Sequence, residues 1–227
     1  MKFLKIENSF LKIIEDTNDL ERTFEKEKKI FSKEILAILF KESKNKFNDN
    51  FIESVYAEIL ISKEKLDLFL SYLFYKNNIK HVFHRVGDVN LRSDMILQSN
   101  NNVGLVEIEK GNNLLDPPRN ILEQYALLKS RYDLKQKISC FIFTSYLPRN
   151  RQDYWNVIED IANITGIKIK TISFASLFLL YLSENLSLKN LEKFDIVDGR
   201  TNHREVIGES LLKNISVGFK GILEIEK

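Results

Sequence analysis

The chain has 227 residues, a mass of 26.6 kDa and a formal net charge of +2, from 34 basic and 32 acidic residues. Apolar residues make up 44% and charged residues 29%, with only 8 glycines and 3 prolines, so the composition excludes collagen-like, linker-like and disordered chains. The single cysteine, Cys140, excludes a disulfide framework and a cysteine-based zinc site, and indicates a reducing compartment.

The N-terminal segment is interrupted by charge at Lys2, Lys5, Glu7 and Lys12 before a long apolar run develops. Neither a signal peptide nor a membrane-spanning helix is therefore expected. We expect a cytoplasmic protein with no membrane partner.

The first third of the sequence is typical of helices. Residues 18–40 are rich in Glu, Lys, Leu and Phe without a helix breaker, and a second helix is expected to start at Asn50 as its cap, with Glu53 in a capping-box position. A third helix is expected from Ser62, because apolar residues then repeat at helical spacing: Leu66, Phe69, Leu70 and Leu73.

After residue 76 the pattern alternates between strands and helices. Strands are expected at 81–87, 91–98, 103–110, 137–146 and 167–174, and helices from Asp116, from about Arg151 to Gly166, at 175–182 and at about 206–212. The second and third strands are expected to form a hairpin across the asparagine-rich turn, and the continuous apolar run at 137–146 is typical of a central strand covered on both faces. This order predicts an α/β fold, a mixed sheet with helices on both faces.

The domain organisation follows from the same pattern. We expect a helical N-terminal region over residues 1–76, an α/β core over 77–185 and a C-terminal extension over 186–227, all within one domain.

Three carboxylates carry the functional signal. Glu107 and Glu109 share one strand face because side chains alternate, and Asp94 is placed in the middle of the preceding strand, where the hairpin can bring it beside Glu107. Oxygen ligands of this kind are those that Mg²⁺ prefers, and a bound divalent ion supplies the chemistry of phosphodiester hydrolysis. Alternating glutamates are also common on half-exposed strands, so a purely structural interpretation stays open.

At these residues the sequence resembles a family. Asp94 before a hairpin, the Glu107-Ile108-Glu109 segment, a helix and a long apolar strand are similar to the PD-(D/E)XK nuclease superfamily, which includes many type II restriction endonucleases. The segment VGLVEIEKGNN is similar to that of BamHI-type enzymes, in which a second glutamate replaces the usual lysine. The resemblance covers residues 81–182 in the order of elements.

The resemblance implies specific roles. Asp94 and Glu107 would bind the metal, Glu109 would occupy the position of the lysine, and Ser93 stands where the motif has proline. Family members often add an acidic residue from an upstream helix, for which Glu53 is the expected residue. A simple capping role for Glu53 is the alternative.

The expected function is that of a Mg²⁺-dependent endonuclease acting on double-stranded DNA, a type II restriction enzyme. A homodimer is expected because palindromic sites match two-fold symmetry, and the restriction resemblance implies a cognate DNA methyltransferase in the same system. Phosphate contacts are expected from four arginines: Arg92, Arg119, Arg149 and Arg151. The alternatives are a less specific repair, recombination or defence nuclease, and a non-catalytic DNA-binding module.

Histidine-based sites have less support. His81 and His84 fall on opposite faces of a strand, and His203 is expected in an isolated loop position. Asp88 is an alternative metal ligand, although a loop aspartate beside Gly87 is more often a turn residue.

Overall fold

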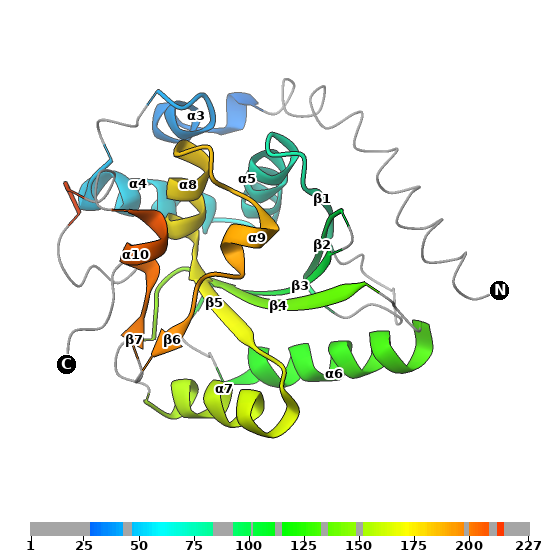
Figure 1. The fold of residues 1–227 in the computed structure, drawn as a ribbon. Helices are drawn as coiled ribbons and strands as arrows, with labels where there is room; N and C mark the ends of the chain where they lie inside the picture. Colours follow the sequence, from blue (N-terminus) through cyan, green and yellow to red (C-terminus); the bar gives the residue numbers. More distant parts are fainter. Residues whose placement is uncertain are drawn as a thin grey trace.

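The computed structural model describes residues 28–42, 47–83, 93–100, 102–111, 115–132, 136–148, 152–197, 200–208 and 213–215. These residues form a five-stranded mixed sheet with helices on both faces (Figure 1). The expected α/β architecture, with helices at the N-terminal side, is confirmed.

The strands follow the order β1-β2-β3-β4-β5 across the sheet. Their bounds are Lys80–Phe83 (β1), Met95–Ser99 (β2), Asn102–Glu109 (β3), Lys137–Thr144 (β4) and Ile169–Ser173 (β5). The first three strands are antiparallel neighbours, whereas β3, β4 and β5 are parallel. The long apolar segment is therefore a central strand, as expected.

The helices lie in two layers. Those of the larger layer and the N-terminal side are η2 (Lys28–Ile30, a 3₁₀ helix), α3 (Lys33–Leu39), α4 (Asp49–Ile59), α5 (Lys63–Tyr75), α8 (Phe174–Leu182), α9 (Leu188–Leu191) and α10 (His203–Ile207). Two long helices, α6 (Asp116–Tyr132) and α7 (Gln152–Thr165), cover the other face of the sheet (Figure 1).

The side-chain alternation of the strands divides the interior into two cores. Val106 and Phe141 point into the larger core, formed with α3, α4, α5 and α8, while Leu105 and Cys140 point into the smaller core under α6 and α7. The larger core contains residues from all three expected segments, from Phe31 to Ile215.

The β2–β3 hairpin has a fixed register. Ser99 pairs with Asn102 and Met95 pairs with Val106, so two residues form the turn. Asn100 has a φ of 52°, which asparagine tolerates better than most residues. At Gly104 a Cβ atom would lie 3.0 Å from the ring of Phe141 and 3.2 Å from Cβ of Leu97, so a larger residue would require these two side chains to shift by a few tenths of an ångström.

Helix starts follow the capping rules, with one correction to the sequence analysis. Ser62 caps α5 as expected, and its hydroxyl accepts from the backbone N–H of Lys65 at 3.2 Å. The cap of α4 is Asn48, whose side chain accepts from Phe51 N–H at 2.9 Å, so the expected Asn50 cap is wrong. Glu53 is therefore not a capping-box residue.

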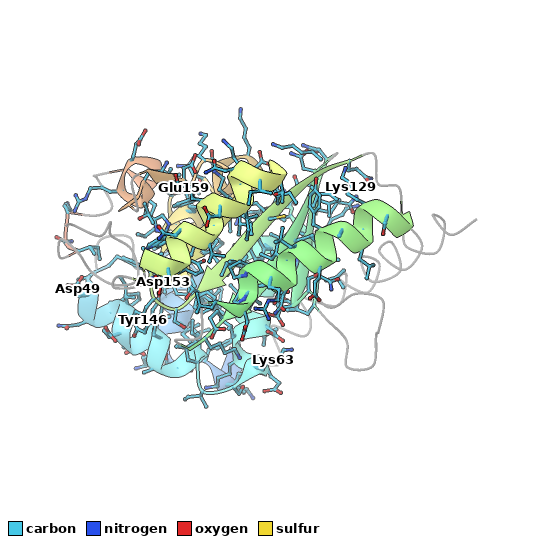
Figure 2. All side chains as sticks on the ribbon, turned by 90° about the horizontal axis from the view of Figure 1, so that it is seen from below. Asp49, Lys63, Lys129, Tyr146, Asp153 and Glu159 are labelled. Atoms are coloured by element: carbon cyan, nitrogen blue, oxygen red, sulfur yellow. The ribbon has the colours of Figure 1, made fainter. Side chains whose placement is uncertain are left out.

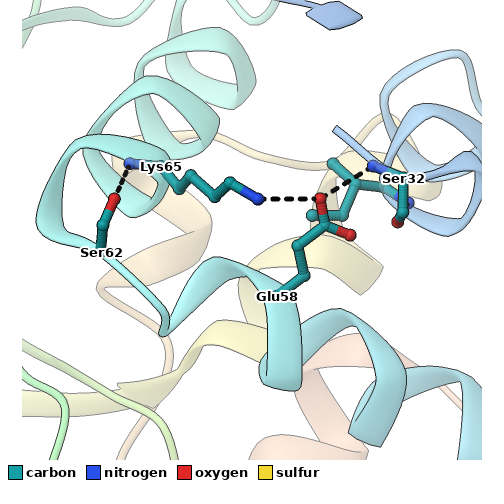
Figure 3. A network of polar contacts seen from close by, with 5 residues as sticks. Ser32, Glu58, Ser62 and Lys65 are labelled. Atoms are coloured by element: carbon teal, nitrogen blue, oxygen red, sulfur yellow. Dashed lines mark hydrogen bonds and ion pairs between the residues drawn. The ribbon is translucent and has the colours of Figure 1, made fainter. Parts of the chain in front are cut away.

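Glu58 on α4 connects three helices. Its Oε1 accepts from the backbone N–H of Ser32, the N-cap of α3, at 2.8 Å and from Nζ of Lys65 on α5 at 3.3 Å (Figure 3). The charge of Lys65 is thereby used inside the helical layer.

The C-terminal segment packs against the sheet. Residues Ile196–Val197 (β6) and Arg200–Thr201 (β7) form a two-stranded sheet that the sequence pattern did not predict. The helix expected at 206–212 is instead His203–Ile207, and residues 209–212 lie outside the described residues. His203 is fully buried, with Nε2 at 2.9 Å from the carbonyl oxygen of Thr171 and Nδ1 at 3.1 Å from the hydroxyl of Ser176. It is thus a core residue of the C-terminal segment and not an isolated loop histidine.

Candidate active site

Asp94 and Glu107 face each other across the β2–β3 hairpin. The ladder ends with Met95 opposite Val106, and the next residue on each side is Asp94 and Glu107. Asp94 thus directly precedes β2, a correction to its expected place inside the strand. Its Oδ2 accepts the backbone N–H of Ile108 at 2.8 Å, which fixes this carboxylate against β3.

Glu107 is a buried acid with an incomplete set of partners. Its residue exposure is 6%, and Oε2 accepts from the side-chain amide of Asn120 on α6 at 3.3 Å. Within the described part of the chain, the buried Oε1 has no hydrogen-bond partner. Burial, followed by the charge of Asp94, raises the pKa of Glu107 to about 8. A cation placed beside Oε1 would oppose this increase, because a nearby positive charge favours the ionised carboxylate.

Helix α6 positions Asn120. The helix begins at Asp116, with Pro117 and Pro118 in its first turn, as the sequence predicts. Asn120 comes from that same turn, so the start of α6 lies beside the carboxylate of Glu107.

Glu109 ends β3 and is partly exposed. Its Oε1 accepts the backbone N–H of Gly111 at 2.6 Å, so this carboxylate is bound locally by the chain that follows the strand. Its charge raises the pKa of Glu107 less than burial and the charge of Asp94 do. Glu109 therefore borders the acidic pair.

Asp67 on α5 is an acidic residue that the sequence analysis did not select. Burial raises its pKa to about 6; the charges of Lys63 and Lys110 oppose this increase, and Asp94 adds to it. Helix α5 therefore brings a third carboxylate within electrostatic range of Asp94. The sequence does contain one indication of a buried acid here, because Asp67 directly follows Leu66 and so lies beside the apolar stripe of the helix.

Glu53 lies on the exposed side of α4. Its Oε2 accepts from the hydroxyl of Tyr146, which follows the carboxyl end of β4, at 3.2 Å (Tyr146 is labelled in Figure 2). Among the described residues, no hydrogen bond or ion pair joins Glu53 to Asp94 or Glu107.

The expected phosphate contacts are only partly within the described structure. Arg119 is exposed in the first turn of α6, next to Asn120. Arg92, Arg149 and Arg151 lie outside the described residues, as do His84 and Asp88. His81 is buried, which lowers its pKa, and its Nδ1 lies 3.2 Å from the carbonyl oxygen of Ile79.

The donor set fits an ion that needs few protein ligands. Among the residues described, no three His, Cys, Asp or Glu side chains form a metal-binding group. Mg²⁺ usually keeps several waters and binds through one or two carboxylates together with substrate phosphates. Glu107 lies opposite Asp94, and its Oε1 accepts no hydrogen bond from the part of the chain that the structure describes, so this pair fits the requirement.

Comparison of the sequence with protein-family models and with curated proteins gives no match. In the described part of the chain, every helix is too short or too polar to cross a lipid bilayer.

Proposed function

We propose that this chain is a Mg²⁺-dependent nuclease that hydrolyses phosphodiester bonds of double-stranded DNA, as a sequence-specific type II restriction enzyme of the PD-(D/E)XK superfamily. The observation that carries the proposal is the buried Glu107 carboxylate, which has Asp94 opposite it and whose Oε1 has no hydrogen-bond partner among the described residues. A buried acid in this state is unfavourable for folding alone, and its clearest use is to bind a cation.

The order of elements supports the same assignment. Asp94 precedes a hairpin whose second strand contains Glu107 and Glu109, and a helix and the central strand β4 follow. This is the order on which the resemblance to the superfamily rests.

Each side chain has a role in the proposal. Asp94, fixed by Ile108 N–H, and Glu107, oriented by Asn120, would hold the ion. Bound there, Mg²⁺ supplies Lewis-acid chemistry, because it lowers the pKa of water and neutralises phosphate charge. Glu109 takes the position of the motif lysine.

Asp67 replaces Glu53 in the proposal as the acid from an upstream helix. Its charge interacts with that of Asp94, whereas Glu53 is hydrogen-bonded to Tyr146. A carboxylate with a pKa of about 6 is mostly ionised at neutral pH, so Asp67 can accept a proton from an attacking water.

The test is digestion of unmethylated phage DNA by the purified full chain, with Mg²⁺ and with EDTA, analysed on a gel. Discrete Mg²⁺-dependent bands support the restriction enzyme, and a smear supports a less specific nuclease. Intact DNA at all protein concentrations contradicts nuclease activity and favours a non-catalytic binding module.

Two variants test whether cleavage depends on the candidate site. Glu107→Ala is expected to abolish cleavage, and Glu159→Gln is the control, because Glu159 is an exposed acid on α7 (Figure 2). Unchanged cleavage by Glu107→Ala contradicts the proposed site. A dimer, and protection of the DNA by methylation of its recognition site, are further parts of the proposal.

A further inference from the structure

Two lysines lie near Asp67, on the α5 side of the sheet, whereas the side chain of Glu107 contacts Asn120 on α6. Lys110 directly follows β3, and its backbone is fixed between strand ends because Ser145 donates its N–H to Glu109 O and its hydroxyl to Lys110 O, each at 3.2 Å. Lys63 is the exposed first residue of α5. Both lysines act electrostatically on Asp67, which in turn interacts with Asp94.

The two ammonium groups are available to a ligand. Within the described residues neither forms an ion pair, whereas other lysines are paired: Lys41 with Glu184, Lys65 with Glu58, Lys137 with Glu192 and Lys170 with Asp195. In the described part of the chain, Lys63 and Lys110 are therefore cations without an ion pair, and their charges lower the pKa of Asp67.

The surface of α7 is acidic. Asp153, Glu159 and Asp160 are all exposed on this helix, and Figure 2 shows Asp153 and Glu159 along its outer side. A polyanion that approached over α7 would be repelled by these exposed carboxylates.

We propose that Lys63 and Lys110 bind the phosphate backbone of the DNA substrate, so that the strand passes the carboxyl end of β3 on the α5 side. This inference rests on the proposed nuclease function. Glu64, Asp67, Asp94 and Glu109 place more negative than positive charge around the two lysines, so DNA binding here also requires the divalent ion.

The experiment compares the full chain with Lys63→Gln and Lys110→Gln in binding a short fluorescein-labelled duplex, by fluorescence anisotropy. Ca²⁺ replaces Mg²⁺, because it has the same charge and the same preference for oxygen ligands. Affinity is measured between about 50 and 200 mM salt, where each phosphate contact contributes about 0.9 to the slope of log affinity against log salt concentration. Each variant is expected to lose about one unit of slope and to bind about threefold or more weakly at low salt.

Lys168→Gln is the matched control. It removes the same charge from an exposed residue that directly precedes β5. This residue lies at the amino end of the parallel strands, whereas Lys110 lies at their carboxyl end. Its slope is expected to equal that of the wild type. Thermal melting of all three variants checks that each is folded.

The outcomes distinguish the nuclease activity from the phosphate-binding role of the two lysines. If the wild type cleaves DNA but Lys63→Gln and Lys110→Gln keep the slope of Lys168→Gln, the lysine assignment is wrong and the nuclease proposal stands. A change in one variant alone overturns the assignment of the other lysine. If the wild type neither binds the duplex nor cleaves DNA with Mg²⁺, the nuclease proposal is wrong, and the inference with it.

Discussion

Replacing Glu107 with glutamine is expected to stabilise the folded protein at alkaline pH while it removes activity. The pKa of Glu107 is raised in the folded state above the value of 4.5 of an ordinary glutamate. The folded protein therefore binds this proton more tightly than the unfolded chain does, and wild-type stability falls as pH rises from about 4.5 to about 8. Glutamine has no charge to bury, so the variant does not share this loss.

The magnitude follows from the pKa. An increase from 4.5 to about 8, at about 1.4 kcal/mol per unit, corresponds to about 4 to 5 kcal/mol of pH-dependent stability. The glutamine amide would be a buried donor beside Asn120, and an unsatisfied donor costs about 1 to 2 kcal/mol. We therefore expect the variant to be less stable than the wild type by about 1 to 2 kcal/mol at pH 4, and more stable by about 3 kcal/mol at pH 9.

Urea unfolding between pH 4 and pH 9 measures this difference, in EDTA so that no metal stabilises the wild type. Glu159→Gln is the control, because an exposed glutamate is expected to give a difference that does not change with pH. If the difference in free energy of unfolding between Glu107→Gln and the wild type is equally independent of pH, this would falsify the argument that burial raises the pKa of Glu107.

The remaining predictions concern the ion, the proposed base and the packing. Mg²⁺ at about ten times its Kd is expected to stabilise the wild type by about 1.4 kcal/mol, an increase in Tm of about 3 to 6 °C, and an equal increase for Asp94→Asn would contradict the role of Asp94. Asp67→Asn is expected to lower kcat by at least about a hundredfold with little change in KM, and the wild-type rate is expected to rise with pH through about 6; an unaltered kcat refutes the role of Asp67. Gly104→Ala is expected to destabilise the fold by about 1 to 3 kcal/mol in urea unfolding, because the new Cβ meets Phe141 and Leu97; an unchanged midpoint contradicts this close packing. His203→Ala is expected to lower the free energy of unfolding by about 2 to 4 kcal/mol, because it removes the two buried hydrogen bonds of the imidazole, to Thr171 O and Ser176 Oγ, and a neutral effect would show that the C-terminal segment is not part of the core.

Local patterns predicted most of the fold. The helical stripe after Ser62, the two prolines after Asp116 and the asparagine-rich turn each determine a nearby element, and the structure confirms all three. The hairpin turn also determines which residues are paired, so the position of Asp94 opposite Glu107 follows from sequence spacing. The cap of α4 was misplaced because Asn48 and Asn50 are chemically equivalent candidates.

Features that depend on contacts between distant segments were not predictable in the same way. Asp67 lies within electrostatic range of Asp94 because α5 packs against the sheet, which the sequence of α5 alone does not specify. The short helix α10 and the burial of His203 depend likewise on residues about thirty positions earlier in the chain, Thr171 and Ser176. For Glu53 the pattern suggested either the site or a cap, and the structure shows a bond to Tyr146.

The length of the turn between Ser99 and Asn102 sets the alignment of the two strands that hold the candidate site. Both proposed metal ligands belong to this one hairpin, so the number of residues in the turn determines whether their carboxylates meet. One inserted residue would shift the pairing and place one of the two acids on the wrong side of the sheet. Natural or engineered changes in turn length should therefore affect metal binding much more than they affect the helical layers.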